Sequence, residues 1–325
     1  MLNIFLYTIT VLIWGSTWFA IEFQLGEVPV EVSLVYRFAF ASALILLLSK
    51  IMGLNLKFNF NQHCFMALLG LLNFSMNYVT LYYAQEYLTS AMTSIGFSML
   101  LLVNIINTRI FFGKKIESKT YLGAALGIAG IIVLFWPEVS NYSAGDSTLT
   151  GLLFVLCGIL IASLGNMVSV RNSNNALPVF QTSGWGMLYG TLFLVIAAVL
   201  NDAKFTVSLE SSYLISLAYL SIFGTVIAFY SYFMLLKNIG PEKASYSIVL
   251  FPFVAVILSN LYEGFEWNQY TVSGFIFVAC GNLIVLTPMV KIKRLLARLK
   301  LTPIEISNAP GLKPQKVDLR PSPTE

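Results

Sequence analysis

The stretch that decides the fold is LTSAMTSIGFSMLLLVNIINTRIFFGKKIESKTYLGAALGIAGIIVLFWP, residues 88–137, together with IGPEKASYSIVLFPFVAVILSNLYEGFEWNQYTVSGFIFVACGNLIVLTP, residues 239–288. A shift of 151 residues aligns the two over 50 positions without a gap. The identical pairs are Ser94/Ser245, Val103/Val254, Ile106/Ile257, Gly113/Gly264, Thr120/Thr271, Gly123/Gly274, Gly130/Gly281 and Pro137/Pro288. Apolar composition alone produces some matches, but shared glycines and a shared terminal proline are harder to obtain by chance. The chain is therefore interpreted as two related halves.

The composition places both halves in a membrane. Of the 325 residues, 57% are hydrophobic and only 10% are charged, and the mean hydropathy is +0.78. A soluble domain carries roughly 25% charged residues. Ten apolar runs approach the length of about 20 residues that spans a bilayer, and they lack the two-residue alternation of a membrane β-barrel. The ten predicted helices lie at about 4–22, 32–49, 63–83, 88–112, 120–136, 151–170, 179–200, 213–236, 245–262 and 268–290.

The number of helices in each half predicts how the halves are oriented. Residues 4–137 and 150–288 each hold five predicted helices, and 289–325 form a basic segment with a disordered tail. Because five is odd, the second half enters the membrane from the opposite side. The charges agree, since Glu86 aligns with Lys237. The predicted fold is an all-α membrane protein of two inverted five-helix repeats around a central cavity, an arrangement used by alternating-access transporters.

The basic residues predict the topology. Cytoplasmic loops carry an excess of Lys and Arg, and 17 of the 19 Lys and Arg residues lie at the end of an even-numbered predicted helix, follow one, or lie in the tail. Arg37 lies within a helix and Lys204 lies on the other side. Both termini are therefore expected to face the cytoplasm, and the first run is interpreted as a retained helix. The net charge of +4 then reports topology, and a nucleic-acid partner is not expected.

Several short motifs resemble those of EamA-type permeases of the drug/metabolite transporter superfamily. They are Trp14-Gly15-Ser16-Thr17-Trp18, the embedded Arg37, Ala244-Ser245-Tyr246 leading to Pro252, and Glu263-Gly264. The resemblance covers about residues 4–288. It implies a ten-helix carrier of the bacterial inner membrane, commonly an exporter of amino acids or other small metabolites, with its substrate in a cavity between the halves.

Two positions in the first half depart from that pattern. Leu101 stands opposite Pro252, and Phe112 stands opposite Glu263. The missing proline predicts that the helix at 88–112 is less kinked than its counterpart. The missing carboxylate predicts that the two gates are unequal.

Arg37 is the clearest candidate for contact with substrate. An ionisable side chain within a membrane helix is costly and is a functional candidate by default. Arg37 lies six residues beyond Glu31, about 9 Å along the predicted helix. Its guanidinium suits a carboxylate or another anionic group of a substrate. The alternative is a structural arginine that bonds carbonyls, Glu22 or Glu31, or that extends outward to the interface.

Further candidates are polar or aromatic residues within the apolar runs. On the polar helix 63–83, Asn73 and Asn77, with Thr80 and Tyr78, are predicted to share a face, and Tyr82 lies one residue off that row. Amides and phenols there suit a zwitterion, and interhelical hydrogen bonding is the alternative. The other candidates for substrate binding are Trp14, Ser16, Thr17, Ser94, Ser98, Asn166, Trp185, Tyr189, Ser245 and Tyr246. Close helix packing is the expected role of Gly123, Gly127 and Gly130.

The predicted function is a secondary transporter, moving a small metabolite such as an amino acid outward by alternating access. The partners are then a small-molecule substrate and the lipid bilayer, with the oligomeric state left open. Neither the three cysteines nor the single His63 indicates a metal or cofactor site. The chain is not expected to be an enzyme, because no cluster of His, Asp, Glu or Arg marks one membrane face. Multidrug efflux, a membrane enzyme and a receptor remain as alternatives.

Overall fold

The apolar runs form helices in the computed structural model, which describes residues 2–137, 147–244 and 246–288. Within these ranges the regular structure is helical throughout. The helices are α1 (Leu2–Glu22), α2 (Val30–Ile51), α3 (Phe60–Leu71), η1 (Leu72–Met76), α4 (Asn77–Gln85), α5 (Ser90–Phe97), α6 (Leu100–Phe112), α7 (Ser118–Leu134), α9 (Ser147–Asn174), α10 (Val179–Leu200), α11 (Ser211–Ser221), η2 (Ile222–Ile227), α12 (Ala228–Ala244), α13 (Tyr246–Tyr262) and α14 (Gln269–Leu286). Elements η1 and η2 are π-helical.

Among the residues that the structure describes, eight helical stretches are long and apolar enough to cross a membrane. They are Leu2–Glu22, Val30–Ile51, Phe60–Gln85, Ser90–Phe112, Ser147–Asn174, Val179–Leu200, Ser211–Tyr232 and Gln269–Leu286. Two shorter apolar helices, Ser118–Leu134 and Leu250–Tyr262, lie where the sequence predicts two more. The prediction of an all-helical membrane protein is therefore confirmed.

Local sequence explains several helix ends. Proline precedes the first residue of both α2 and α10, at Pro29 and Pro178, where its missing N–H costs nothing. Asn59 and Gln62 form a reciprocal capping box at the start of α3. Gly113 ends α6 with a positive φ of 67°, which glycine adopts at little steric cost.

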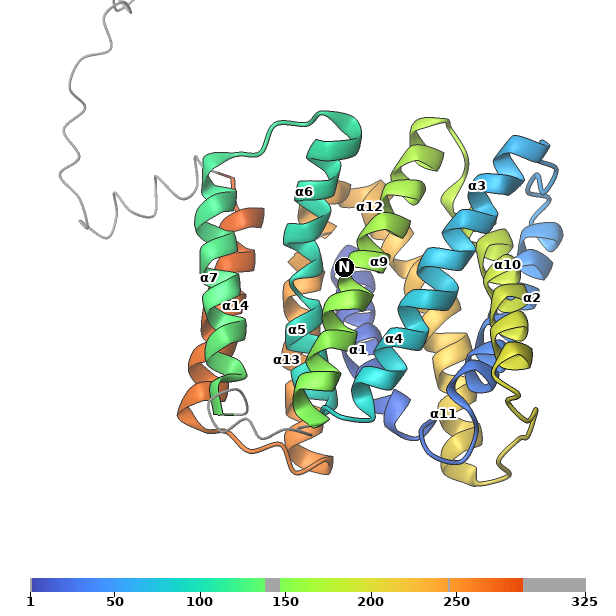
Figure 1. Ribbon diagram of the computed structural model, residues 1–325. Coiled ribbons are helices and arrows are strands. Elements are labelled where there is room, and N and C mark those ends of the chain that lie inside the picture. The colour runs from blue at the N-terminus through green and yellow to red at the C-terminus, as the bar shows by residue number, and fades with distance from the viewer. Residues whose placement is uncertain (1, 138–146, 245, 289–325) are drawn as a thin grey trace, which may run out of the picture. The chain divides into compact units, whose positions relative to one another are not determined.

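Helices from distant parts of the chain pack side by side within one unit that ends at Leu286 (Figure 1). Helix α1 packs against α11, α12 and α13, and α9 packs against α3, η1 and α4. Helix α2 lies along α10. The first helix of each predicted half therefore contacts the helices around the π segment of the other half.

Helices α7 and α14 pack along each other through glycines and run in opposite directions (Figure 1). A Cβ built on Gly123 would lie 2.7 Å from the carbonyl oxygen of Gly281, and one on Gly130 would lie 2.7 Å from that of Gly274. The two backbones thus approach too closely for any side chain. Such small-residue contacts let membrane helices associate without a hydrophobic driving force. The predicted packing role of Gly123 and Gly130 agrees with these contacts.

The expectation of a straighter first-half helix at 88–112 is wrong. The helix is interrupted at Ser98 and Met99, between α5 and α6, whereas α13 continues through Pro252. The Ser98 amide divides its hydrogen bond between the carbonyls of Ser94 and Ile95, and its hydroxyl donates to Ile95 at 2.6 Å. Tight turns of this kind replace regular helical bonding and bend a helix without proline.

A single added methyl group tests the α7–α14 contact. We expect Gly130→Ala to destabilise the protein by about 1–3 kcal/mol, because its Cβ would meet backbone that cannot move aside. Gly127→Ala is the matched control on the same helix, since its Cβ would meet the flexible end of Met99. The measurement is the thermal unfolding midpoint of both variants in detergent. Equal midpoints for the two variants would contradict the packing role.

Candidate functional site

The Arg37 side chain is buried among aromatic rings of α2 and α4. The residue is 2% exposed, one guanidinium nitrogen donates to the Tyr82 hydroxyl at 3.2 Å, and Cζ lies 4.8 Å from the centre of the Tyr78 ring. The Nε–H group is buried and has no hydrogen-bond partner. Within the described residues no carboxylate oxygen lies within 4.0 Å of the Arg37 nitrogens. The guanidinium therefore has one N–H group without a partner among the described residues, and its positive charge faces aromatic rings with no carboxylate beside it.

Glu31, the nearest predicted partner along α2, is engaged elsewhere. It is 5% exposed and accepts hydrogen bonds from the Tyr83 hydroxyl at 2.9 Å and from the Asn201 amide at 3.1 Å. Burial and the charge of Glu31 raise the pKa of the carboxyl of Glu86, the residue directly after α4. The alternative in which Arg37 is a structural partner of Glu31 or Glu22 therefore lacks the required contact.

The predicted polar row on the third helix divides between two neighbours. The side chains of Asn73 and Thr80 lie against Gly165 and Gly158 of α9, whereas Tyr78 contacts Arg37 on α2. Asn77 is buried, and its Oδ1 atom has no hydrogen-bond partner. Asn73 lies within the π segment, and Asn73 and Thr80, seven residues apart, keep the common face toward α9. Tyr78 comes five residues after Asn73, which is about 140° round an α-helix at 3.6 residues per turn, so it lies on another side.

Three asparagine amides form a chain across three helices. Asn73 donates to Asn166 on α9 at 3.1 Å, and Asn166 donates to Asn104 on α6 at 3.3 Å. The structure therefore brings together the predicted residues Asn73 and Asn166. Asn104 was missed because an isolated asparagine in an apolar run shows no partner in the sequence.

The predicted residues on α1 connect it to the helices around η2. Trp14 Nε1 donates to the carbonyl of Gly224 at 3.2 Å, and the hydroxyls of Ser16 and Tyr219 are 2.6 Å apart. Thr17 donates to the carbonyl of Trp14 within its own helix. The hydrogen bonds of Trp14 and Ser16 join helices, which is the interhelical role that polar groups take in membranes.

Aromatic rings connect the surroundings of Arg37 with those of Trp14. Centroid distances are 4.8 Å from Tyr78 to Phe38, 5.7 Å from Phe38 to Phe74, 6.4 Å from Phe74 to Phe229 and 5.2 Å from Phe229 to Trp14. These rings come from α1, α2, η1, α4 and α12. A series of aromatic ring contacts therefore extends from the Arg37 guanidinium to Trp14 on α1.

The comparisons with known proteins identify the family. The model of the EamA-like transporter family matches residues 1–136 and again residues 149–287. The chain belongs to the EamA-like transporter family. The resemblance noted from the sequence motifs is therefore confirmed, and with the apolar helices it identifies a membrane transporter.

Two relatives of the chain are named as transporters. An uncharacterized transporter in the trpA 3' region of Buchnera aphidicola subsp. Schlechtendalia chinensis is 24% identical over 283 residues, 87% of this chain and 92% of that protein. The uncharacterized inner membrane transporter YedA of Escherichia coli strain K12 is 29% identical over 251 residues, 77% of this chain and 79% of YedA. One crystal structure aligns with a TM-score of 0.65 at 16% identity, covering 90% of this chain and 98% of that one, which supports the fold alone.

The remaining predicted residues of this EamA-like chain lie apart from Arg37. Trp185 and Tyr189 pack on His63, with 4.8 Å between the Trp185 and His63 rings and 3.0 Å between the Tyr189 hydroxyl and His63 Nδ1. Ser94 and Ser98 are buried and donate to carbonyls of their own helix. Ser245 and the side chain of Tyr246 lie outside the described residues.

Two tryptophans provide a matched test of the α1 contact. We expect Trp14→Phe to lower the free energy of unfolding by roughly 0.5–1.5 kcal/mol more than Trp185→Phe does. Both changes remove the same atoms, but only the Trp14 indole N–H has a hydrogen-bond partner, since Trp185 Nε1 has none. Denaturant titration in detergent gives the two values. A larger loss for Trp185→Phe would contradict the assignment.

Proposed function

We propose that this protein is a secondary transporter that exports small carboxylate-bearing metabolites, such as amino acids, by alternating access across the bacterial inner membrane. The proposed architecture has ten membrane helices in two inverted repeats, 4–137 and 150–288, around a central cavity, with both termini in the cytoplasm. The observation that carries the substrate class is the buried Arg37 guanidinium, with an unpartnered Nε–H and no carboxylate beside it.

The glycine contacts between α7 and α14 support the inverted repeat. The sequence alignment pairs Gly123 with Gly274 and Gly130 with Gly281. In space Gly123 meets Gly281 and Gly130 meets Gly274. Each aligned pair therefore exchanges contacts with the other aligned pair. Reciprocal contacts of this kind are expected where a two-fold axis relates two equivalent surfaces. Both repeat copies would contribute the same small-residue face to this crossing.

The π segments give independent support for the same symmetry. Leu72–Met76 and Ile222–Ile227 occupy nearly equivalent positions under the shift of 151 residues that aligns the later parts of the halves. Each lies in the third predicted helix of its half. A shared irregularity at a shared position favours two copies of one structural unit. Inverted copies allow one packing to occur in two related forms, which open toward opposite faces.

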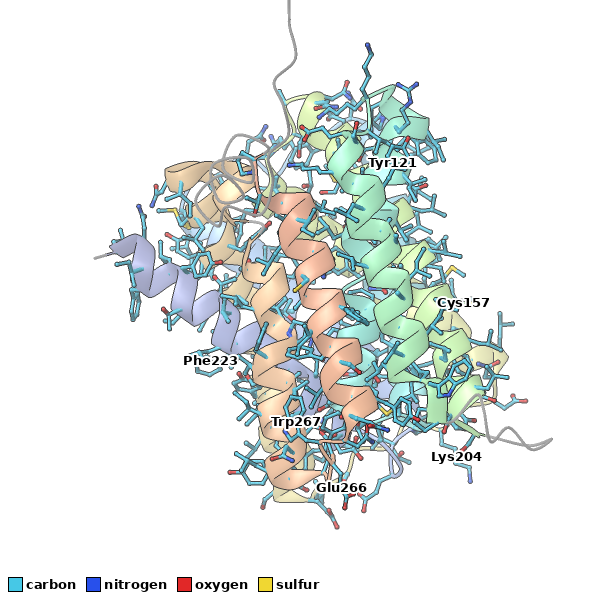
Figure 2. All side chains as sticks on the ribbon, turned by 90° about the vertical axis from the view of Figure 1, so that its left-hand side faces the viewer. Tyr121, Cys157, Lys204, Phe223, Glu266 and Trp267 are labelled. Atoms are coloured by element: carbon cyan, nitrogen blue, oxygen red, sulfur yellow. The ribbon has the colours of Figure 1, made fainter. Side chains whose placement is uncertain are left out.

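The charged ends of the bundle support the proposed topology. Figure 2 shows Glu266 and Lys204 toward one end of the bundle and Tyr121 toward the other. Lys204 is the one basic residue that the loop pattern assigns to the acidic side, and here it shares an end with Glu266. The name of YedA, an inner membrane transporter, agrees with the proposed location. Outward direction is favoured by the family resemblance.

The groups around Arg37 favour a substrate with a carboxylate over a cationic drug. A carboxylate would accept hydrogen bonds from the guanidinium, whose Nε–H has no partner. A cationic drug would instead need an available buried carboxylate. The buried Glu31 already accepts two hydrogen bonds from neutral groups.

Flux measurements test the role of Arg37 directly. In proteoliposomes we expect Arg37→Ala to reduce flux of labelled amino acids about 10- to 100-fold, because a hydrogen bond to a charged group contributes roughly 1.5–3 kcal/mol. The decarboxylated amines of the same amino acids should show no such change. Arg109→Ala is the matched control, since Arg109 is exposed at the end of α6. Equal losses for both compound classes would mean that Arg37 is structural.

A further inference from the structure

Glu263, just after the end of α13, is bonded to the first residue of α5. Its Oε2 atom accepts a hydrogen bond from the Ser90 backbone N–H at 2.8 Å and another from the Ser259 hydroxyl at 2.7 Å. Ser90 and Ser259 are both 0% exposed. The carboxylate therefore joins helices that belong to different halves of the chain, at a partly buried contact.

The chemistry of this contact makes it stronger than an ordinary neutral hydrogen bond. The first N–H groups of a helix have no partner within the helix, and they carry partial positive charge. Ser90 is the first residue of α5, so its N–H is one of these groups. A carboxylate acceptor gives a charge-assisted bond, about twice as strong as a neutral one. Glu263 thus connects the start of α5 to the end of α13.

The residues at the symmetry-equivalent positions cannot form the same hydrogen bond. The gapless alignment pairs Glu263 with Phe112 and Ser90 with Pro241. Phenylalanine has no acceptor, and proline has no backbone N–H to donate. Both partners of the bond are therefore missing at the equivalent position. A symmetric bundle would have two such contacts, one at each end, and this chain encodes one.

The contact is also incompletely satisfied, which keeps it reversible. Glu263 Oε1 and Ser90 Oγ are both buried without a hydrogen-bond partner. Glu22, at the end of α1, is a second carboxylate that interacts electrostatically with Glu263. Unpartnered buried oxygens and a neighbouring like charge reduce the net stabilisation that the bonds provide. Opening this end would let water reach those atoms.

We propose that the Glu263–Ser90 bond is a one-sided latch, which biases the transporter toward the state closed at the Glu263 end. The inference rests on the proposed alternating-access function. Glu263 is here a positioning residue, since it acts on substrate only by holding α5 against α13. The end that carries Phe112 and Pro241 has no equivalent latch, so the two access states differ in free energy in the absence of substrate.

Thiol labelling of a buried reporter tests the latch without any substrate. Ser94, one turn after Ser90 and 2% exposed, is replaced by Ser94→Cys in a chain whose native Cys64, Cys157 and Cys280 are changed to serine. A membrane-impermeant maleimide is applied from the Glu263 side of oriented vesicles. We expect Glu263→Gln and Glu263→Ala to raise the labelling rate, by roughly tenfold for Glu263→Ala, which corresponds to about 1.4 kcal/mol in the opening equilibrium.

Glu266→Gln is the matched control, because it removes the same charge from an exposed residue three positions away. Its labelling rate should equal that of the parent, and labelling from the opposite side should not rise in any variant. Size-exclusion chromatography and circular dichroism verify that each variant is folded. Unchanged labelling in folded Glu263→Gln and Glu263→Ala would overturn the latch.

A flux measurement separates this proposal from the proposed function. Flux of labelled amino acids in proteoliposomes by the unmodified chain, with Ser94 and the native cysteines in place, tests transport itself. Raised labelling without any flux would support the latch and refute amino-acid transport. Flux with unchanged labelling would support transport and refute the latch.

Discussion

A hydrocarbon environment leaves each backbone N–H and C=O group only the protein to bond with, because no water competes there. Continuous helices meet that demand locally, and the same demand extends to side chains. Ser94, Ser98 and Thr17 accordingly donate to carbonyls of their own helices. Where a helix departs from α geometry, bonds come from a neighbour. Trp14 donates to η2, and Asn166 accepts from Asn73 in η1. The hydrogen bonds of these polar side chains therefore connect particular pairs of helices.

Against that background, an unsatisfied polar group is informative. Most polar side chains on the predicted list have found partners that explain their presence structurally, as Trp14, Ser16 and Asn166 have. Asn77 and Trp185 each keep an unpartnered buried atom, but Arg37 is also charged, and its guanidinium faces aromatic rings with no carboxylate beside it, at a cost that an apolar residue would avoid. A group retained at such a cost is better explained by an intermittent partner. A substrate carboxylate that enters and leaves would be such a partner.

The sequence predicted the parts of the fold that depend on composition and periodicity. Apolar runs gave the helices, the shared glycines marked the α7–α14 contact, and Arg37 stood out as the ionisable residue within a helix. It did not predict the interruption at Ser98–Met99 or the π segments, because both arise from choices among nearly equivalent hydrogen-bond patterns. Asn73 and Thr80 nevertheless keep their predicted common face. Tyr78 lies elsewhere because five residues correspond to about 140° round an α-helix.

Partner choice was the other part that the sequence left open. Trp185 and Tyr189 satisfy the helical spacing of a binding face, but spacing cannot say which neighbouring helix supplies His63. Glu31 and Glu263 lie at or near helix ends, where carboxylates are normally solvated. The Glu263-Gly264 motif drew attention to Glu263, but the local sequence does not show which group either carboxylate bonds. Their roles depend on residues 52 and 173 positions away in the chain, Tyr83 and Ser90. Such long-range pairs become visible only once the helices are packed.

The two carboxylates also show why the proposed symmetry cannot be complete. Two identical copies related by a two-fold axis would give two access states of equal free energy, and net bias would then come from substrate gradients alone. The two halves differ at this contact, because Phe112 stands at the position aligned with Glu263 and Pro241 at the position aligned with Ser90. The second charge-assisted bond is therefore missing, while both halves keep the glycines of the α7–α14 contact. The two halves thus differ in sequence at the ends of the bundle and agree at the α7–α14 contact. This is the pattern expected if the α7–α14 contact is present in both access states and the contacts at the ends determine which state is more stable. Duplicated carriers can thus keep a common scaffold and still acquire a preferred side.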